Sequence, residues 1–201
     1  MEKDSNYLRL WGTHLRWAAL CPTAWEIVFS CRVPVNYSTP PVVEETRNVH
    51  DKIAKIVEEL FDGNTNAQYV GKDAVEYTIK LGDGESYITL VAKPDLYVLW
   101  NADGKLINLV VEVTTRSLAH IPREWLAAEM LGFYIRSLRP TFTLLIQFET
   151  SKIMIRTGVL PLSVALFKEL KRLILNGTKR KPTLSLCYNC DLRVVCPSPL
   201  V

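Results

Sequence analysis

"KPDLYVLWNADGKLINLVVEVT" (residues 93–114) contains two β-prone runs separated by the turn sequence NADGK. Asp and Gly favour the tight turns that connect antiparallel strands, so the segment predicts a hairpin with strands at 95–100 and 106–114. Two acidic residues stand out in these strands. Asp95 begins the first run, and Glu112 interrupts a β-branched run that is typical of a buried strand. The hairpin would bring Asp95 and Glu112 onto neighbouring strands, where they can converge on one site.

The elements around this hairpin are predicted from hydrophobic periodicity and turn residues. They mix helices with strands, which is typical of an α/β domain with a central mixed sheet flanked by helices. The length of 201 residues suits a single domain that spans 1–201. The predicted elements are a helical region at 1–35, a loop at 36–48, a helix at 49–60, a hairpin at 75–81 and 86–93, a helix at 122–137, strands at 141–149 and 152–158, and a helix at 161–177.

Composition and charge exclude several classes of protein. A hydrophobic content of 48% and a charged content of 22% are ordinary for a globular chain. No apolar run approaches the ~20 residues that a membrane-spanning helix needs, and the acids in MEKDSNYLRLW (1–11) do not fit a secretory signal. We therefore expect an intracellular, cytoplasmic protein without a membrane partner. The net charge of +3 permits a nucleic-acid partner without requiring one, and the basic triplet at 179–181 is by itself typical of a solvated turn.

The acidic pair has the chemistry of a cation site. A buried ionised carboxylate is costly unless it is paired or bound to a cation. Two hard oxygen ligands close together suit Mg²⁺ or Mn²⁺. His50, near the start of the helix at 49–60, is a third candidate ligand. The alternatives are that Glu112 pairs with an Arg or Lys, that Asp95 caps a turn, and that His50 is a helix-end or core histidine.

A second candidate site lies near the C-terminus, where CYNCDLRVVC (187–196) holds three of the five cysteines. Reducing conditions inside cells disfavour disulfides and favour metal binding, so a disulfide framework is the weaker alternative. Four thiolates suit either Zn²⁺ or a [4Fe–4S] cluster, although a zinc ribbon would need a second C-x2-C pair, which this sequence lacks. Cys21 and Cys31 are the candidates for the fourth ligand. Ligation by Cys21 would close a loop of almost the whole chain and act as a structural clasp.

Two further patterns carry a family resemblance. KPD (93–95) followed by EVT (112–114) resembles the PD-(D/E)XK nuclease signature, and His50 in TRNVH resembles the RecB-like branch of that group. The Cys-Pro pair at Cys21, together with the C-x2-C-x5-C spacing at 187–196, is similar to the CRISPR-associated RecB-like exonucleases that carry an iron–sulfur cluster. The match covers nearly the whole chain in order, and its cysteine layout is more specific than its nuclease motif.

The resemblance implies a PD-(D/E)XK (RecB-like) nuclease fold whose central sheet holds the active site. It also implies a Mg²⁺- or Mn²⁺-dependent exonuclease that trims single-stranded DNA ends for CRISPR spacer acquisition, with the CRISPR integrase and other adaptation proteins as partners. The implied cation ligands are His50, Asp95, Glu112 and the Val113 carbonyl. The implied ligands of a [4Fe–4S] cluster are Cys21, Cys187, Cys190 and Cys196, so that 178–201 and the segment around Cys21 form an iron–sulfur region that joins the two termini. Cys31 is then a buried small hydrophobe.

The chain departs from the family pattern at four positions. Thr114 replaces the motif lysine, Thr46 replaces a glycine before the histidine, Glu129 replaces a glutamine, and Phe133 replaces a tyrosine. Thr114 shares a strand face with Glu112 but brings no positive charge to a phosphate.

Two nearby cations are candidates to replace the missing charge. Lys93 shares the strand face of Asp95, and Arg116 shares that of Glu112. Lys93 is the better group for proton transfer, because the pKa of an arginine is very high. If neither compensates, the sequence favours a catalytically weakened iron–sulfur subunit that binds DNA ends. A zinc-bearing nucleic-acid-binding protein is the second alternative.

Overall fold

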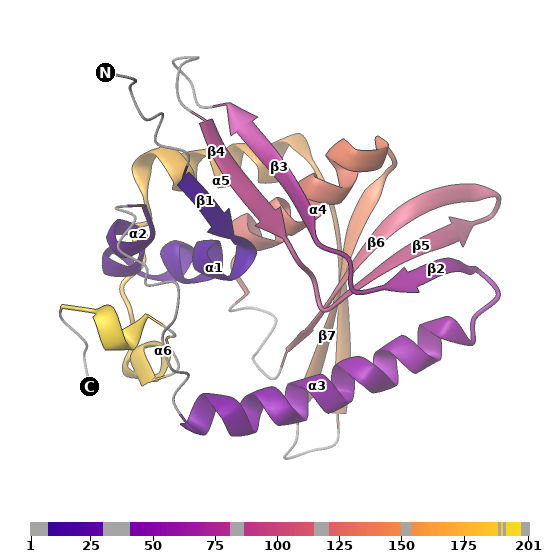
Figure 1. Cartoon of the computed structure of the whole chain (residues 1–201), viewed down its shortest axis with the longest axis horizontal. Coiled ribbons are helices and arrows are strands. Elements are labelled where there is room, and N and C mark those ends of the chain that lie inside the picture. The colour runs from indigo at the N-terminus through magenta and orange to yellow at the C-terminus, as the bar shows by residue number, and fades with distance from the viewer. Residues whose placement is uncertain are drawn as a thin grey trace, which may run out of the picture.

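The computed structural model describes residues 8–29, 41–80, 87–114, 121–149, 154–188, 190 and 192–197. Arg116 and Cys31 lie outside these ranges, as do residues 30–40 and 81–86, which include the predicted GDGE turn. The helices and strands, labelled in Figure 1, are β1 (Leu8–Trp11), α1 (Gly12–Leu20), α2 (Pro22–Phe29), α3 (Pro41–Asp62), β2 (Ala67–Gly71), β3 (Val75–Lys80), β4 (Tyr87–Ala92), β5 (Leu96–Ala102), β6 (Lys105–Thr114), α4 (Arg123–Ser137), β7 (Thr141–Glu149), β8 (Met154–Pro161), α5 (Val164–Asn176), α6 (Leu184–Tyr188) and the 3-10 turn η2 (Arg193–Val195).

The strands form two mixed sheets rather than the one central sheet that the sequence predicted. One sheet has three strands in the order β1-β4-β3, and the other has five in the order β2-β5-β6-β7-β8. β1 runs parallel to β4 and β6 runs parallel to β7, while the other neighbours are antiparallel. The short connection at 93–95 leads from β4 into β5 and so from one sheet to the other. Pro94 lies within it, and a proline cannot donate a hydrogen bond to a strand ladder.

Both predicted hairpins are confirmed, and the second has the register that the acidic pair requires. β5 and β6 pair from Leu96 with Val111 to Ala102 with Lys105. Their turn is formed by Asp103 and Gly104, which both have positive φ, as a tight hairpin turn requires. The predicted helices at 49–60, 122–137 and 161–177 are also confirmed as α3, α4 and α5, although α5 begins only at Val164 and residue 161 ends β8.

Three local predictions are wrong. Residues 8–11 were expected to be helical but form β1, which pairs in parallel with β4 and buries Leu10 to 2% exposure. The predicted loop at 36–48 overlaps α3, which begins at Pro41, because a proline is well tolerated in the first turn of a helix. Strand β2 was not predicted at all. In β1 and β2 the deciding factor is a partner strand that is distant in sequence, which short-range periodicity does not report.

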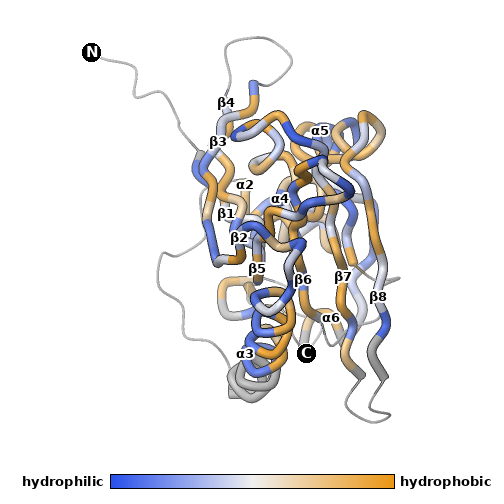
Figure 2. The backbone as a smooth tube through the Cα atoms, turned by 90° about the vertical axis from the view of Figure 1, so that its right-hand side faces the viewer, coloured by the Kyte–Doolittle hydropathy of each residue, from blue (hydrophilic) through white to orange (hydrophobic). Residues whose placement is uncertain are grey.

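Helix α4 lies at the centre of the fold. It contacts β3 and β4 of the smaller sheet, β6 and β7 of the larger one, and helices α1 and α5. Helix α3 covers the opposite face of the larger sheet and contacts β2, β5 and β6 (Figure 1). Figure 2 shows hydrophobic residues concentrated in the central strands and in α4. No helix among the described residues is long and apolar enough to cross a membrane.

Successive side chains at the end of β6 point alternately into two different buried layers. Val111 and Val113 belong to the hydrophobic cluster beneath α3, whereas Val110 belongs to the cluster that includes α4. Because side chains alternate along a strand, Glu112 and Thr114 share the α4 side with Val110. The end of β6 therefore turns a carboxylate toward α4.

The side chain of Asn108 ties β5, β6, β7 and α4 together below this point. Its amide donates to the Phe133 carbonyl, the Ser137 hydroxyl and the Thr141 hydroxyl, and its carbonyl accepts from the Tyr97 hydroxyl at 3.0 Å. Asn108 is fully buried.

Asn108→Ala should lower the free energy of unfolding by about 3 kcal/mol, because it leaves several buried polar groups without their partner. Asn101→Ala is the matched control, since its side chain accepts one exposed hydrogen bond from the Gly104 N–H. Urea denaturation of both variants measures the difference. Equal losses for the two would contradict a central role for Asn108.

Candidate functional site

The acidic pair meets where the two sheets join. The register of β5 and β6 ends with Leu96 beside Val111, so Asp95 lies next to Glu112, as the hairpin predicted. The Val113 N–H donates to Asp95 Oδ2 at 2.7 Å, which orients the carboxylate along the end of β6. Asp95 and Glu112 also interact directly through their carboxyl groups. The strand ends therefore hold two carboxyl groups together.

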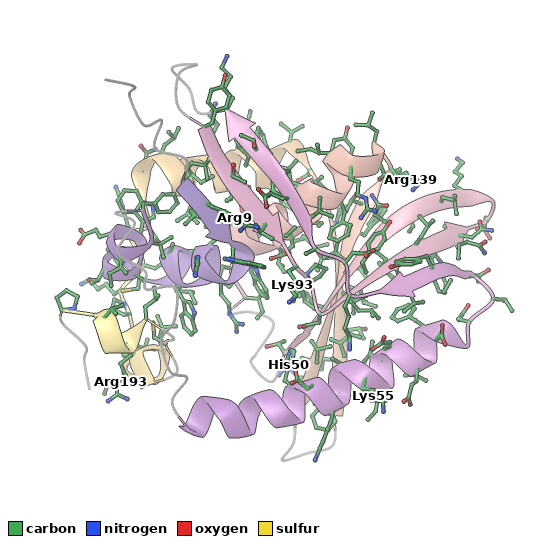
Figure 3. The ribbon with its side chains drawn as sticks, in the orientation of Figure 1. Arg9, His50, Lys55, Lys93, Arg139 and Arg193 are labelled. Carbon is green, nitrogen blue, oxygen red and sulfur yellow. The ribbon has the colours of Figure 1, made fainter. Side chains whose placement is uncertain are left out.

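His50 reaches the same point from α3. Its Nε2 lies 3.1 Å from Asp95 Oδ2 and 3.1 Å from the Val113 carbonyl oxygen. Figure 3 shows His50 on the side of α3 that faces the strands, below the connection that carries Lys93. The hydrogen bond to Asp95 raises the pKa of His50 from 6.5 to about 9, against the opposing effect of burial. The protonated imidazole therefore places a positive charge at this point.

Two glutamates lie buried beside this group. Glu112 is 4% exposed and Glu129, from α4, is 2% exposed. Burial is the main cause that raises the pKa of Glu112 well above its ordinary value, with Asp95 and Glu129 adding to it. Burial also raises the pKa of Glu129 to about 8, while hydrogen bonds from the Lys93 backbone N–H and from Trp125 oppose the rise. The site thus contains three neighbouring carboxyl groups.

Part of this carboxyl group cluster has no hydrogen-bond partner in the protein. Trp125 Nε1 donates to Glu129 Oε1 at 3.2 Å. Glu112 Oε1 and Glu129 Oε2, however, are buried and find no partner within the described part of the chain. An unsatisfied buried carboxylate oxygen is costly and calls for a proton, a water molecule or a cation.

Helix α1 closes the site from the other side, which the sequence did not predict. Gly12, its first residue, lies so close to Glu129 that a Cβ atom there would collide with the carboxylate. Arg16 lies one turn further on, with its guanidinium 5.0 Å from the centre of the Trp125 ring and 5.8 Å from that of Trp17. The positive charge of Arg16 opposes the rise in the pKa of Glu112. The available signal was an arginine between the apolar residues Leu15 and Trp17 of this helix.

Thr114, which occupies the position of the motif lysine, and the two cations proposed to compensate for that lysine lie in different surroundings. Thr114 is buried at 6% exposure near the end of β6, as its spacing from Glu112 predicted. The Lys93 side chain is exposed at the junction of the sheets, and only its backbone N–H acts on Glu129. Arg116 lies outside the described residues. Glu129, which the sequence identified only as a replacement for glutamine, belongs to the site itself.

The four cysteines that the family pattern selects also come together. Cys21 caps the C-terminal end of α1, and with Cys187, Cys190 and Cys196 it lines one cavity whose walls include Trp17 and Leu186. In the C-terminal segment, the N–H of residue 190 bonds to the carbonyl of 187, that of 193 to 190, and that of 196 to 193. This three-residue period brings side chains onto one face. No disulfide joins these four described cysteines.

The donor types fit the groups that the resemblance implies, although the side chains are not arranged around a common point. Within the described ranges, no group of three or more His, Cys, Asp or Glu residues is positioned to hold a metal ion. At the acidic site His50 and Asp95 are hydrogen-bonded to each other, so binding a cation would require them to separate. Oxygen and imidazole donors suit Mn²⁺ or Mg²⁺ there, and thiolates suit iron–sulfur or zinc in the cysteine cavity.

Comparison with known proteins identifies a similar fold but no family. No family model matches the chain, and no curated protein matches it either. The crystal structure of SSO0001 has a TM-score of 0.53 and 17% sequence identity, over 100% of this chain and 90% of that chain. It therefore shares the fold. A protein named "Putative exonuclease" from Eubacterium rectale has a TM-score of 0.42 and 8% identity, over 97% of this chain and 95% of that chain. A similarity this low carries no argument about function.

The raised pKa values predict how stability depends on pH. Glu129 is raised from 4.5 to about 8 and His50 from 6.5 to about 9, so the folded protein binds more protons than the unfolded chain in this window. Stability of the metal-free protein should therefore fall as pH rises from 4.5 toward 9, with the contribution of His50 fully present below 6.5.

Glu129→Gln should make this fall shallower up to about pH 8, because the glutamine has no proton to lose. The measurement is the free energy of unfolding in urea at a series of pH values with a chelator present. The exposed Glu59→Gln is the control and should keep the slope of the parent. An unchanged slope in Glu129→Gln would contradict a buried, protonated Glu129.

Proposed function

We propose that the protein is a Mg²⁺- or Mn²⁺-dependent exonuclease that acts on single-stranded DNA ends and has a PD-(D/E)XK (RecB-like) fold. The observation that supports this most is the pair of buried carboxylate oxygens, Glu112 Oε1 and Glu129 Oε2, that find no partner within the described part of the chain. They lie beside Asp95 and His50, in the order along the chain that the nuclease motif requires. A divalent cation would satisfy the oxygens that these residues leave unpaired.

In hydrolysis, the protein residues would hold a cation that activates the phosphate and the attacking water. A bound divalent cation supplies a Lewis acid, which polarises the phosphate and lowers the pKa of the attacking water. His50, Asp95, Glu112 and the Val113 carbonyl would hold it. Asp95 is already oriented by the Val113 N–H at 2.7 Å. His50 must give up its proton to bind a metal, because Nε2 is the atom that faces both Asp95 and Val113.

The cysteine cavity supports a second part of the proposal. Four cysteines from opposite ends of the chain line it, and their thiolates would bind one [4Fe–4S] cluster. The cluster would clasp the C-terminal segment to the end of α1. A role in CRISPR spacer acquisition, beside the integrase, rests on the resemblance in sequence.

A second candidate function is a DNA-end-binding subunit without nuclease activity. The observation in its favour is Thr114, because the buried position next to Glu112 has no lysine to orient the attacking water. This candidate keeps the cluster and the DNA binding but expects no cleavage.

Asp95→Asn should lower Mn²⁺-dependent cleavage of single-stranded DNA by at least about 10²-fold, because it removes a cation ligand and leaves Glu112 without a bound cation. Asp103→Asn, in the exposed turn between β5 and β6, is the matched control. Cleavage of an end-labelled oligonucleotide and Mn²⁺ binding by electron paramagnetic resonance are measured together. Cleavage that is equal in Asp95→Asn and the parent would refute this site, whereas Mn²⁺ binding without cleavage in the parent would favour the DNA-end-binding subunit.

Protein purified without oxygen should be brown and contain about four iron atoms per chain, because four thiolates can hold one cluster. Cys187→Ser should lose the iron and have a lower melting temperature, while Cys31→Ser should keep both. Iron analysis and thermal unfolding test this. A colourless protein with one tightly bound zinc, made with iron available, would instead support the zinc-bearing alternative.

A further inference from the structure

We infer that Arg16, on helix α1, binds the substrate phosphate and supplies beside Glu112 the positive charge that Thr114 lacks. This inference deepens the proposed nuclease function and rests on it. Arg16 lies almost a hundred residues before the strand position that carries the motif lysine in the family, so the sequence pattern could not point to it.

The position of Arg16 is set by two tryptophans. Its guanidinium lies 5.0 Å from the centre of the Trp125 ring on α4 and 5.8 Å from that of Trp17 on its own helix. Trp125 also donates to Glu129 Oε1 at 3.2 Å, so one indole contacts both the arginine and a carboxylate of the site. Arg16 is half-buried. These contacts restrain the guanidinium at the edge of the carboxyl cluster.

The charge of Arg16 reaches the reactive carboxylates. Arg16 lies over the Trp125 ring whose indole N–H binds Glu129, and its positive charge lowers the pKa of Glu112, against burial, Asp95 and Glu129, which raise it. With a divalent cation held by these carboxylates, the Arg16 guanidinium would pair with a substrate phosphate instead.

The chemistry of arginine fits a phosphate better than it fits proton transfer. A guanidinium stacked on aromatic rings keeps N–H groups in its own plane, and these match the oxygens of a phosphate. Its pKa is too high for it to act as a base. Arg16 would therefore bind the phosphodiester and stabilise the charge that develops on it.

Arg16→Gln tests the inference through DNA binding without cleavage. Affinity for a single-stranded oligonucleotide, measured by fluorescence anisotropy with Ca²⁺ at several salt concentrations, should fall about 10-fold. The slope of log Kd against log salt should fall by about 0.7, the value for one lost phosphate contact on a single strand. Arg16→Lys keeps the charge and should keep the slope. Arg9→Gln is the matched control, because Arg9 lies 5.6 Å from the centre of the Trp11 ring but is exposed and pairs with Glu76.

Cleavage with Mn²⁺ tests the catalytic consequence. Arg16→Gln should cleave about 10²-fold more slowly than the parent, and adding Thr114→Lys to it should restore part of the rate. Thr114→Lys alone should change the rate of the parent little, because Arg16 already supplies the charge. A urea unfolding curve of Arg16→Gln shows whether that variant folds. If it does not, Thr114→Lys alone still tests the inference.

Two outcomes would overturn the inference. One is a salt slope in folded Arg16→Gln that equals that of the parent, and the other is a large gain in cleavage from Thr114→Lys alone. Failure of the proposed function gives a different result. If the parent does not cleave with Mn²⁺ but Arg16→Gln still loses the salt-dependent contact, the nuclease proposal is wrong and the phosphate contact stands.

Discussion

The burial of two neighbouring glutamates, Glu112 at the end of β6 and Glu129 on helix α4, is the constraint on which the arrangement of this protein depends. Two carboxyl groups at 4% and 2% exposure cannot both be ionised without compensation. The surrounding residues supply part of it: the Trp125 N–H, the Lys93 backbone N–H and the charge of Arg16. Burial raises the pKa values of both glutamates, so that protons supply the rest.

Helix α1 connects the acidic site to the cysteine cavity. Its first residue, Gly12, leaves room for the Glu129 carboxylate, and Arg16 faces the carboxyl cluster from its middle. Trp17 contacts the Arg16 guanidinium on one side and lines the cysteine cavity, and Cys21 caps the end of the helix. One nine-residue helix thus spans from one candidate site to the other. Helix α2 continues this link, because Trp25 donates to the Leu173 carbonyl of α5 at 2.8 Å.

The hydrogen bonds of the acidic site also explain how it could exchange protons for a cation. His50 Nε2 is shared between Asp95 Oδ2 and the Val113 carbonyl, and the imidazole holds its proton up to about pH 9. The same three atoms are donors of the kind that bind Mn²⁺. Binding would release protons from His50 and from the glutamates, so in the proposed nuclease the cation replaces charge that the protein otherwise neutralises itself.

The sequence by itself determined most of the local elements and the pairing of the acidic residues. The NADGK turn and the β-branched runs around it are short-range signals, and they were sufficient to place Asp95 beside Glu112. His50 was expected near the start of a helix, but α3 begins at Pro41, so His50 lies well inside it. The cysteine spacing together with the family resemblance likewise identified four residues that line one cavity. Only the tertiary structure decided the division into two sheets, the pairing of β1 with β4, and the presence of Arg16 and Gly12 at the acidic site. These depend on contacts between segments far apart in the chain, and such contacts leave no periodic trace in either segment alone.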